Sequence, residues 1–145
     1  MKKVILVLAL GMLAMSFISC EKEEVNPNLI EVMENQEYYQ RVGNDEGLRV
    51  VSETRIYTLI RFVSMPSCHS QFRLGYARYN LITSDEDTFS YRARMDDRTV
   101  YQYAFRTKGS DTLNLTVYAY DEINEEHTQL EDIDYVKGDP FVICN

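Results

Sequence analysis

The chain is poor in the residues that most often do chemistry. Its 145 residues include no tryptophan, only two histidines and only three cysteines. A catalytic Ser, Thr or Cys needs a base within hydrogen-bond reach, and only His69 and His127 could act as one. Cys68 and His69 are neighbours in sequence, so their side chains would point to opposite faces of a strand. We therefore expect no enzymatic activity, and a small hydrolase is the less favoured alternative.

Positive charge and cofactor motifs are also scarce. The chain has 15 Lys and Arg against 23 Asp and Glu, a net charge of −8. That balance disfavours nucleic acid as a partner and direct adhesion to anionic lipid. Residues 121–127 offer Asp, Glu and His side chains as metal ligands, but no glycine stands where a calcium loop would turn. There is no glycine-rich phosphate loop either, so we expect no metal and no cofactor.

The first 19 residues have the pattern of an export signal. Lys2 and Lys3 precede an apolar run over residues 4–18, which is shorter than the roughly 20 residues needed to span a bilayer. The run ends in Phe-Ile-Ser-Cys at residues 17–20. This resembles a bacterial lipobox, with Phe where Leu is usual, and implies that Cys20 becomes the first mature residue and carries acyl chains such as palmitate. Cleavage after the Ala-Met-Ser at residues 14–16 is the alternative, and it would release a soluble protein.

The residues after Cys20 add an expected location. Lys22, Glu23 and Glu24 resemble the acidic export tag of Bacteroidota surface lipoproteins. The resemblance covers about residues 1–24 and implies a lipid-anchored protein of the outer membrane that faces the cell exterior. Residues 20–40 are expected to be an acidic tether. A capping-box pattern at residues 28–31 could start a short helix through about Arg41.

The other two cysteines are Cys68 and Cys144. In an oxidising compartment an even pair is more often a disulfide than a metal or catalytic pair. We predict that they are joined, and two free buried thiols are the alternative.

Residues 41–145 are expected to form a single all-β domain. Apolar and polar residues alternate over 48–63, with a bend near 52–54, and over 71–82, with a bulge near 75–78. Three further strands are predicted at 89–95, 101–106 and 113–119, a loop or marginal helix at 121–138, and a last short strand at 140–144. The short connections predict an antiparallel meander of about six or seven strands that forms a β-sandwich. A small lipocalin-like barrel is the alternative.

Tyrosine and arginine supply the candidate ligand-facing residues. Of the eleven tyrosines, Tyr91, Tyr101 and Tyr103 are expected to pack in the core, and packing is the commoner role of Tyr in strands. The candidate ligand-facing side chains are Tyr57, Tyr118, Tyr120, Arg92 and Arg94. Residues 41–108 are rich in Arg, whereas both ends of the mature chain are acidic. Cross-strand ion pairs would explain this layout, and a site for an anion, an acidic glycan or an acidic protein surface is the alternative.

Two further motifs of the sequence contain aspartate. The pair Asp96 and Asp97 is expected to be a turn between strands rather than an acid–base pair. Asp111-Thr112-Leu113 resembles the acceptor of Bacteroidota protein O-glycosylation, which implies a sugar on Thr112. Taken together, we expect a lipid-anchored, non-catalytic binding module for a protein or glycan partner, with a structural envelope lipoprotein as the alternative.

Overall fold

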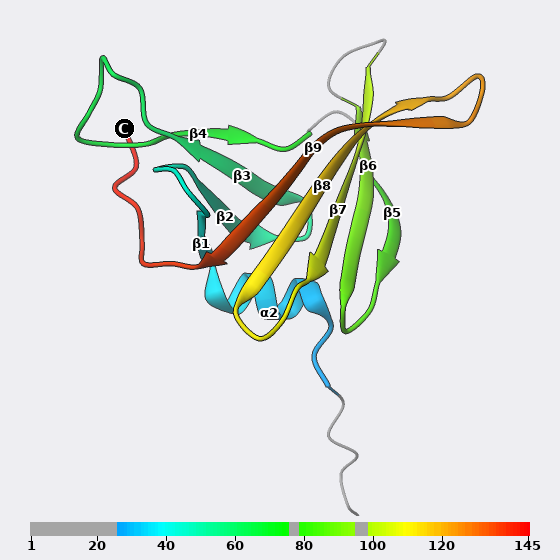
Figure 1. Ribbon diagram of the computed structural model, residues 1–145, viewed down its shortest axis with the longest axis horizontal. Coiled ribbons are helices and arrows are strands. Elements are labelled where there is room, and N and C mark those ends of the chain that lie inside the picture. Colours follow the sequence, from blue (N-terminus) through cyan, green and yellow to red (C-terminus); the bar gives the residue numbers. More distant parts are fainter. Residues whose placement is uncertain (1–25, 76–78, 95–98) are drawn as a thin grey trace, which may run out of the picture.

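The computed structural model describes residues 26–75, 79–94 and 99–145. The export signal, Cys20, the export tag and the Asp96-Asp97 pair lie outside these residues. In the described ranges the elements are α2 (Leu29–Gln36), β1 (Tyr38–Arg41), β2 (Gly47–Ser52), β3 (Arg55–Ile60), β4 (Ser70–Arg73), β5 (Tyr79–Ser84), β6 (Thr88–Arg94), β7 (Val100–Thr107), β8 (Thr112–Asp121) and β9 (Glu126–Lys137). Figure 1 shows them as a curved sheet with one helix against it.

All nine strands belong to one antiparallel sheet, in the order β4-β3-β2-β1-β9-β8-β7-β6-β5. Consecutive strands are antiparallel neighbours within two groups, β1–β4 and β5–β9. The two groups meet where β1 pairs with β9, for example at Arg41 and Tyr135. We call them the short arm (β1–β4) and the long arm (β5–β9). The predicted all-β antiparallel meander is confirmed. It has nine strands in a single open sheet, rather than six or seven strands in a sandwich or a closed barrel.

The structure differs from the sequence prediction in four segments. Residues 48–63 form the hairpin of β2 and β3, in which Val50 pairs with Ile56 across the turn at Glu53 and Thr54. Residues 71–82 form β4 and β5, which lie at opposite edges of the sheet. The predicted loop at 121–138 is mostly β9, and the last predicted strand is only a single bridge between His69 and Ile143.

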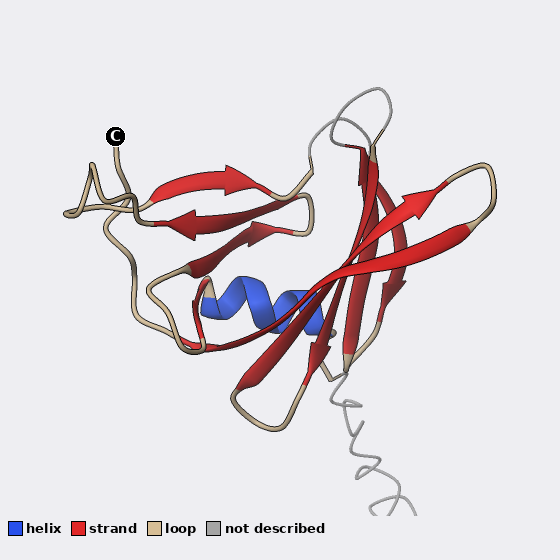
Figure 2. Cartoon of the chain, turned by 45° about the horizontal axis from the view of Figure 1, so that its top comes forward, coloured by secondary structure: helices blue, strands red, loops and turns tan. Residues whose placement is uncertain are grey.

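Helix α2 lies on the inner face of the sheet, between the two arms (Figure 2). Asn28 caps it, because its side chain accepts from the Glu31 backbone while the Glu31 carboxylate accepts from the Asn28 backbone. Leu29, Ile30 and Met33 are buried in the core. Residues 29–40, which we expected in the tether, therefore belong to the folded unit, because the apolar face of α2 and the pairing of β1 are both needed to complete it.

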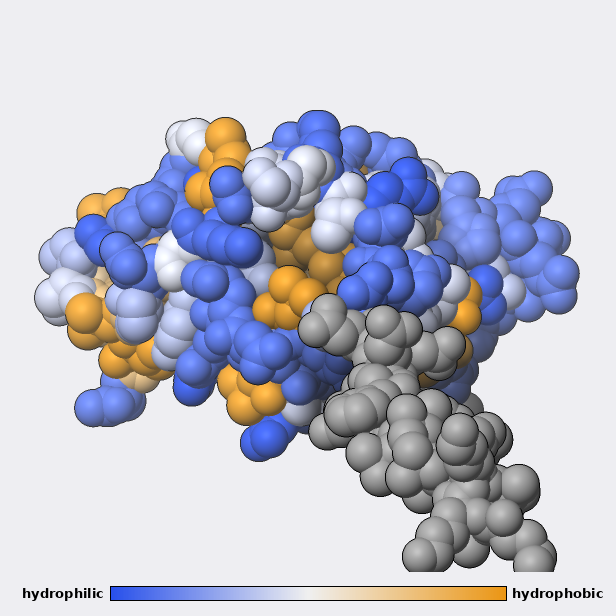
Figure 3. All heavy atoms as spheres, turned by 90° about the horizontal axis from the view of Figure 1, so that it is seen from below, coloured by the Kyte–Doolittle hydropathy of each residue, from blue (hydrophilic) through white to orange (hydrophobic). Residues whose placement is uncertain are grey.

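The core fills the inner face of the sheet. Strands β6 to β9 present alternate residues to it, as a half-buried strand does. Its aromatic contacts include Phe89 with Phe105, at 6.2 Å between ring centroids, and Tyr91 with Tyr103, at 5.2 Å. Helix α2 has eight residues, and no helix in the described ranges is both long and apolar enough to cross a membrane. From below, the molecule shows apolar residues in small separate areas within a largely hydrophilic surface (Figure 3).

The C-terminal segment is fastened to the short arm. Cys68 and Cys144 form the disulfide that the sequence predicted, with their Cα atoms 5.1 Å apart. His69 donates its backbone N–H to Val142 and accepts from Cys144. The ring of Phe141 meets the His69 ring edge-on at 4.7 Å. The segment thereby covers part of the short arm's outer face.

Candidate functional site

The outer face of the long arm gathers four of the five predicted ligand-facing residues. In the register of the sheet, Gln102 of β7 lies opposite both Arg92 of β6 and Tyr118 of β8. Tyr120 of β8 lies opposite His127 of β9. Strand alternation places all five side chains on the face away from the core. We call Arg92, Gln102, Tyr118, Tyr120 and His127 the outer cluster.

Close contacts hold the outer cluster together. The Arg92 guanidinium lies over the Tyr120 ring at 3.7 Å from the centroid, a cation–π arrangement. Arg92 Nε donates to Gln102 Oε1 at 3.2 Å, and the same oxygen lies 2.9 Å from His127 Nε2. The His127 ring lies 4.8 Å from Tyr120 and 5.9 Å from Tyr118, the latter edge-on. Both tyrosines are half-buried, so one side of each ring packs on the sheet.

The fourth predicted residue, Arg94, borders the outer cluster. It forms an ion pair with Glu122 at 2.6 Å, and a small hollow of about 90 Å³ lies between Arg92, Arg94, Tyr120 and Glu122. The tip of the β8–β9 hairpin follows, and there Asp121 accepts from the backbone of Ile123 and from Asn124. These hydrogen bonds lower the pKa of Asp121, and the one from the Ile123 backbone has the largest effect. The cluster therefore offers both donors and acceptors around two aromatic rings.

Tyr57 lies apart from the outer cluster. It is on β3 in the short arm, where it pairs with Arg49 of β2 and Arg73 of β4. Arg49 is occupied by an ion pair with Glu37 at 2.8 Å, and it lies over the ring of Tyr38. The hydrogen bond to Glu37 is the main cause of the raised pKa of Arg49. The structure thus brings four predicted residues together and separates the fifth.

Sequence reasoning missed Gln102 and the role of His127. His127 was placed in an acidic loop, whereas β9 carries it opposite Tyr120. The other histidine, His69, is 2% exposed, and its Nε2 lies 3.1 Å from the Asp45 carbonyl oxygen and 3.5 Å from its carboxylate. It packs under the C-terminal segment beside a disulfide. That position suits a structural histidine better than a catalytic base.

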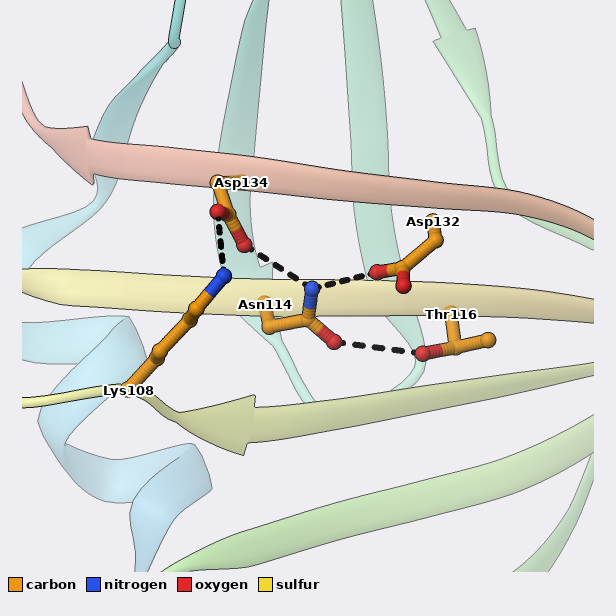
Figure 4. Close-up of polar contacts among 5 residues, drawn as sticks. All are labelled: Lys108, Asn114, Thr116, Asp132 and Asp134. Atoms are coloured by element: carbon orange, nitrogen blue, oxygen red, sulfur yellow. Dashed lines mark hydrogen bonds and ion pairs between the residues drawn. The ribbon is translucent and has the colours of Figure 1, made fainter.

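The far end of the same outer face carries a different polar network (Figure 4). The Asn114 amide donates to both Asp132 and Asp134, at 2.5 Å and 2.9 Å, and Lys108 donates to Asp134 at 2.7 Å. Thr116 completes the network by donating to Asn114 at 3.1 Å. The hydrogen bonds from Lys108 and Asn114 lower the pKa of Asp134. The network is satisfied internally and joins β8 to β9.

Charge pairing explains part of the basic and acidic layout of the chain. Two ion pairs, Arg94 with Glu122 and Lys108 with Asp134, join the basic segment 41–108 to the acidic C-terminal third. A third pair, Lys137 with Asp111, lies within that C-terminal third. Asp111 precedes Thr112, the candidate acceptor for sugar, which is half-buried at the start of β8. No group of three or more His, Cys, Asp or Glu suited to a metal occurs within residues 26–75, 79–94 and 99–145.

Comparison with protein-family models, with curated proteins and with solved structures finds no match to this chain.

Proposed function

We propose that this protein is a lipid-anchored, non-catalytic binding module on the outer membrane, facing the cell exterior, and that the outer cluster binds a glycan. The observation that carries the proposal is the meeting of Tyr118, Tyr120 and His127 with Arg92 and Gln102 on one exposed face. The five side chains come from four neighbouring strands. A rigid sheet is a better base for a binding site than a loop.

The chemistry of the outer cluster suits a sugar ring. Tyrosine has an apolar ring and a polar tip, which match the apolar faces and the hydroxyl groups of a pyranose. Arg92 offers five N–H donors; its Nε–H donates to Gln102, and its Nη2 lies 3.4 Å from His127 Nε2. Glu122 supplies a carboxylate acceptor nearby, beside its ion pair with Arg94. Because acidic residues of the β8–β9 hairpin border the cluster, a neutral glycan fits its charge better than an acidic one.

A second candidate function rests on the sheet edges. Strands β4 and β5 end the sheet, and Leu81 and Ile82 on β5 are 50% and 44% exposed. An unpaired edge with exposed apolar side chains can accept a strand from another protein. A protein partner would then bind at β5 rather than at the outer cluster.

The binding test uses matched tyrosine variants. Tyr120→Leu removes the ring under Arg92, whereas Tyr57→Leu makes the same change on the short arm, outside the cluster. Calorimetry with maltoheptaose, mannohexaose and xylohexaose, and with hexagalacturonate as the acidic comparator, measures binding. We expect at least one neutral oligosaccharide to bind and Tyr120→Leu to weaken it about tenfold, equivalent to about 1.4 kcal/mol. Tyr57→Leu should leave the affinity unchanged.

Two outcomes would contradict the glycan proposal. Equal losses in Tyr120→Leu and Tyr57→Leu would place binding outside the cluster. Binding of no oligosaccharide, together with capture of a partner that is lost when Leu81 and Ile82 are replaced by Lys, would favour the protein-binding alternative.

The anchoring half of the proposal has its own test. Cys20→Ala should leave an uncleaved or soluble precursor, whereas the parent protein should partition into detergent. Replacing Lys22, Glu23 and Glu24 by Ala should remove protease accessibility in intact cells while membrane association persists. Equal partitioning, or unchanged accessibility, would overturn the lipid anchor or the surface location respectively.

A further inference from the structure

A second, separate cavity lies on the inner face of the sheet. It is a cleft of about 410 Å³ between the arms, and residues of β3 line it on one side and residues of β7, β8 and β9 on the other. Tyr101, Tyr103, Val117 and Ile133 form the wall of the long arm, and Ile60 faces them from the short arm. A cleft of this volume, with largely apolar and aromatic walls, is in the range of small-molecule sites.

Glu131 is one of two carboxylates that line this cleft, the other being Glu46. Val117 of β8 pairs with Glu131 of β9, and β9 continues inward to Ile133 and Tyr135, both of which face the core. A bulge precedes Glu131, because Tyr118 pairs with Gln129 and leaves Leu130 without a partner in the register. Glu131 therefore shares the inner face with the tyrosines, whereas Leu130 is half exposed beside it.

The charge of the cleft is set by Glu131. The other charged lining residues, Arg41 and Glu46, form an ion pair with each other. In the described part of the chain no Lys or Arg forms an ion pair with Glu131. Its negative charge reaches the tyrosines: the pKa of Tyr103 is raised first by burial and then by Tyr101 and Glu131. One carboxylate beside aromatic faces, without a cation of its own, is an arrangement complementary to an organic cation.

We propose that the cleft between the arms binds a small amphipathic organic cation, an amine with an apolar body. The ammonium group pairs with the Glu131 carboxylate and lies near the faces of Tyr101 and Tyr103. The apolar body fills the space between Ile60, Val117 and Ile133. The site is on the opposite face of the sheet from the outer cluster and does not depend on the glycan proposal.

The test compares three ligands of one shape and different charge. The probes are 4-phenylbutylammonium, 4-phenylbutanol and 4-phenylbutyrate, titrated into the folded protein and followed by NMR chemical-shift changes. We expect the cation to bind at least tenfold more tightly than the alcohol and the anion, with shifts at residues of β7 and β9 that line the cleft. Glu131→Gln should reduce the affinity for the cation to that for the alcohol.

Glu34→Gln is the matched control, because Glu34 is an exposed acid on α2 outside the cleft. It should leave all three affinities unchanged, which separates a local carboxylate from the general attraction of an acidic protein for cations. Circular dichroism verifies that both variants fold. Equal affinity for the cation and the alcohol, equal effects of the two variants, or no binding of any probe would overturn the proposal.

Discussion

Gly75 is the position where a single methyl group should test the packing between the arms most directly. It follows β4 by two residues and lies against Ala93 of β6 in the long arm. The backbone of the preceding residue, Leu74, donates to Ile56 at 2.8 Å and accepts from the Tyr91 hydroxyl at 3.1 Å. A Cβ added at Gly75 would lie 2.0 Å from the Ala93 Cβ and 3.6 Å from the Tyr103 ring. Gly75 is thus packed directly on β6.

Gly75→Ala should destabilise the protein through two separate terms. The φ of Gly75 is +72°, and the left-handed conformation costs a residue with a Cβ roughly 1–2 kcal/mol. Overpacking a well-filled core costs about 1–3 kcal/mol more. The expected loss is therefore about 2–5 kcal/mol, a large share of the roughly 5–15 kcal/mol that stabilises a domain.

Gly109→Ala separates the two terms. Gly109 also has a positive φ, +85°, but a Cβ there would meet no atom within 4 Å. This variant should lose only the conformational term, about 1–2 kcal/mol. In the double variant Gly75→Ala with Ala93→Gly, the steric term should disappear, because the clashing Cβ is gone. Urea denaturation of the parent protein, these three variants and Ala93→Gly alone, with the slope m checked for constancy, measures the free energy of unfolding.

The result that would refute this reasoning is equal destabilisation by Gly75→Ala and Gly109→Ala. It would mean that the backbone at Gly75 shifts at no energetic cost and that it is not tightly packed against Ala93. A double variant no more stable than Gly75→Ala, after correction for Ala93→Gly alone, would also contradict the steric account.

Two further predictions concern the ends of the sheet. Replacing Cys68 and Cys144 by Ala opens a loop of 76 residues and should lower the free energy of unfolding by up to about 4 kcal/mol; an unchanged urea midpoint would contradict this. The lowered pKa of Asp134 means that its ionised form is stabilised in the folded state, so its contribution is full above the ordinary Asp pKa and is lost as the pH falls through the folded value. The stability difference between the parent and Asp134→Asn should therefore shrink from about pH 6 to about pH 2, and a constant difference would show that Lys108 and Asn114 contribute nothing to that site.

Local pattern determined the strands that the sequence predicted well. Alternation over β6, β7 and β8 is regular, and their connections are short, so the faces of Tyr91, Tyr103 and Leu115 followed from the period of two. The Asn28–Glu31 capping box was also visible, because both of its hydrogen bonds lie within one turn. The export context and an even pair of cysteines predicted the disulfide. Each of these inferences needs only residues close in sequence or a simple count.

Alternation could not distinguish a bent strand from a hairpin. The turn at Glu53 and Thr54 has two residues, so Val50 and Ile56 remain on the same face whether the chain bends or reverses. The same ambiguity hid the division between β4 and β5. Only the pairing of distant strands, which depends on the packing of α2 between the arms, decides where the chain turns back.

The tertiary structure alone decided the fate of β9 and of both candidate sites. The acidic residues of β9 predict a loop when read alone, because the strand buries only Ile133 and Tyr135. In the sheet, the Asn114 amide donates to Asp132 and Asp134, Lys108 forms an ion pair with Asp134, and β1 and β8 complete the backbone hydrogen bonds of β9. The sequence thus determined which residues face outward within each strand. The register between strands determined that His127 meets Tyr120 and that Glu131 meets the inner tyrosines, because register depends on contacts far apart along the chain.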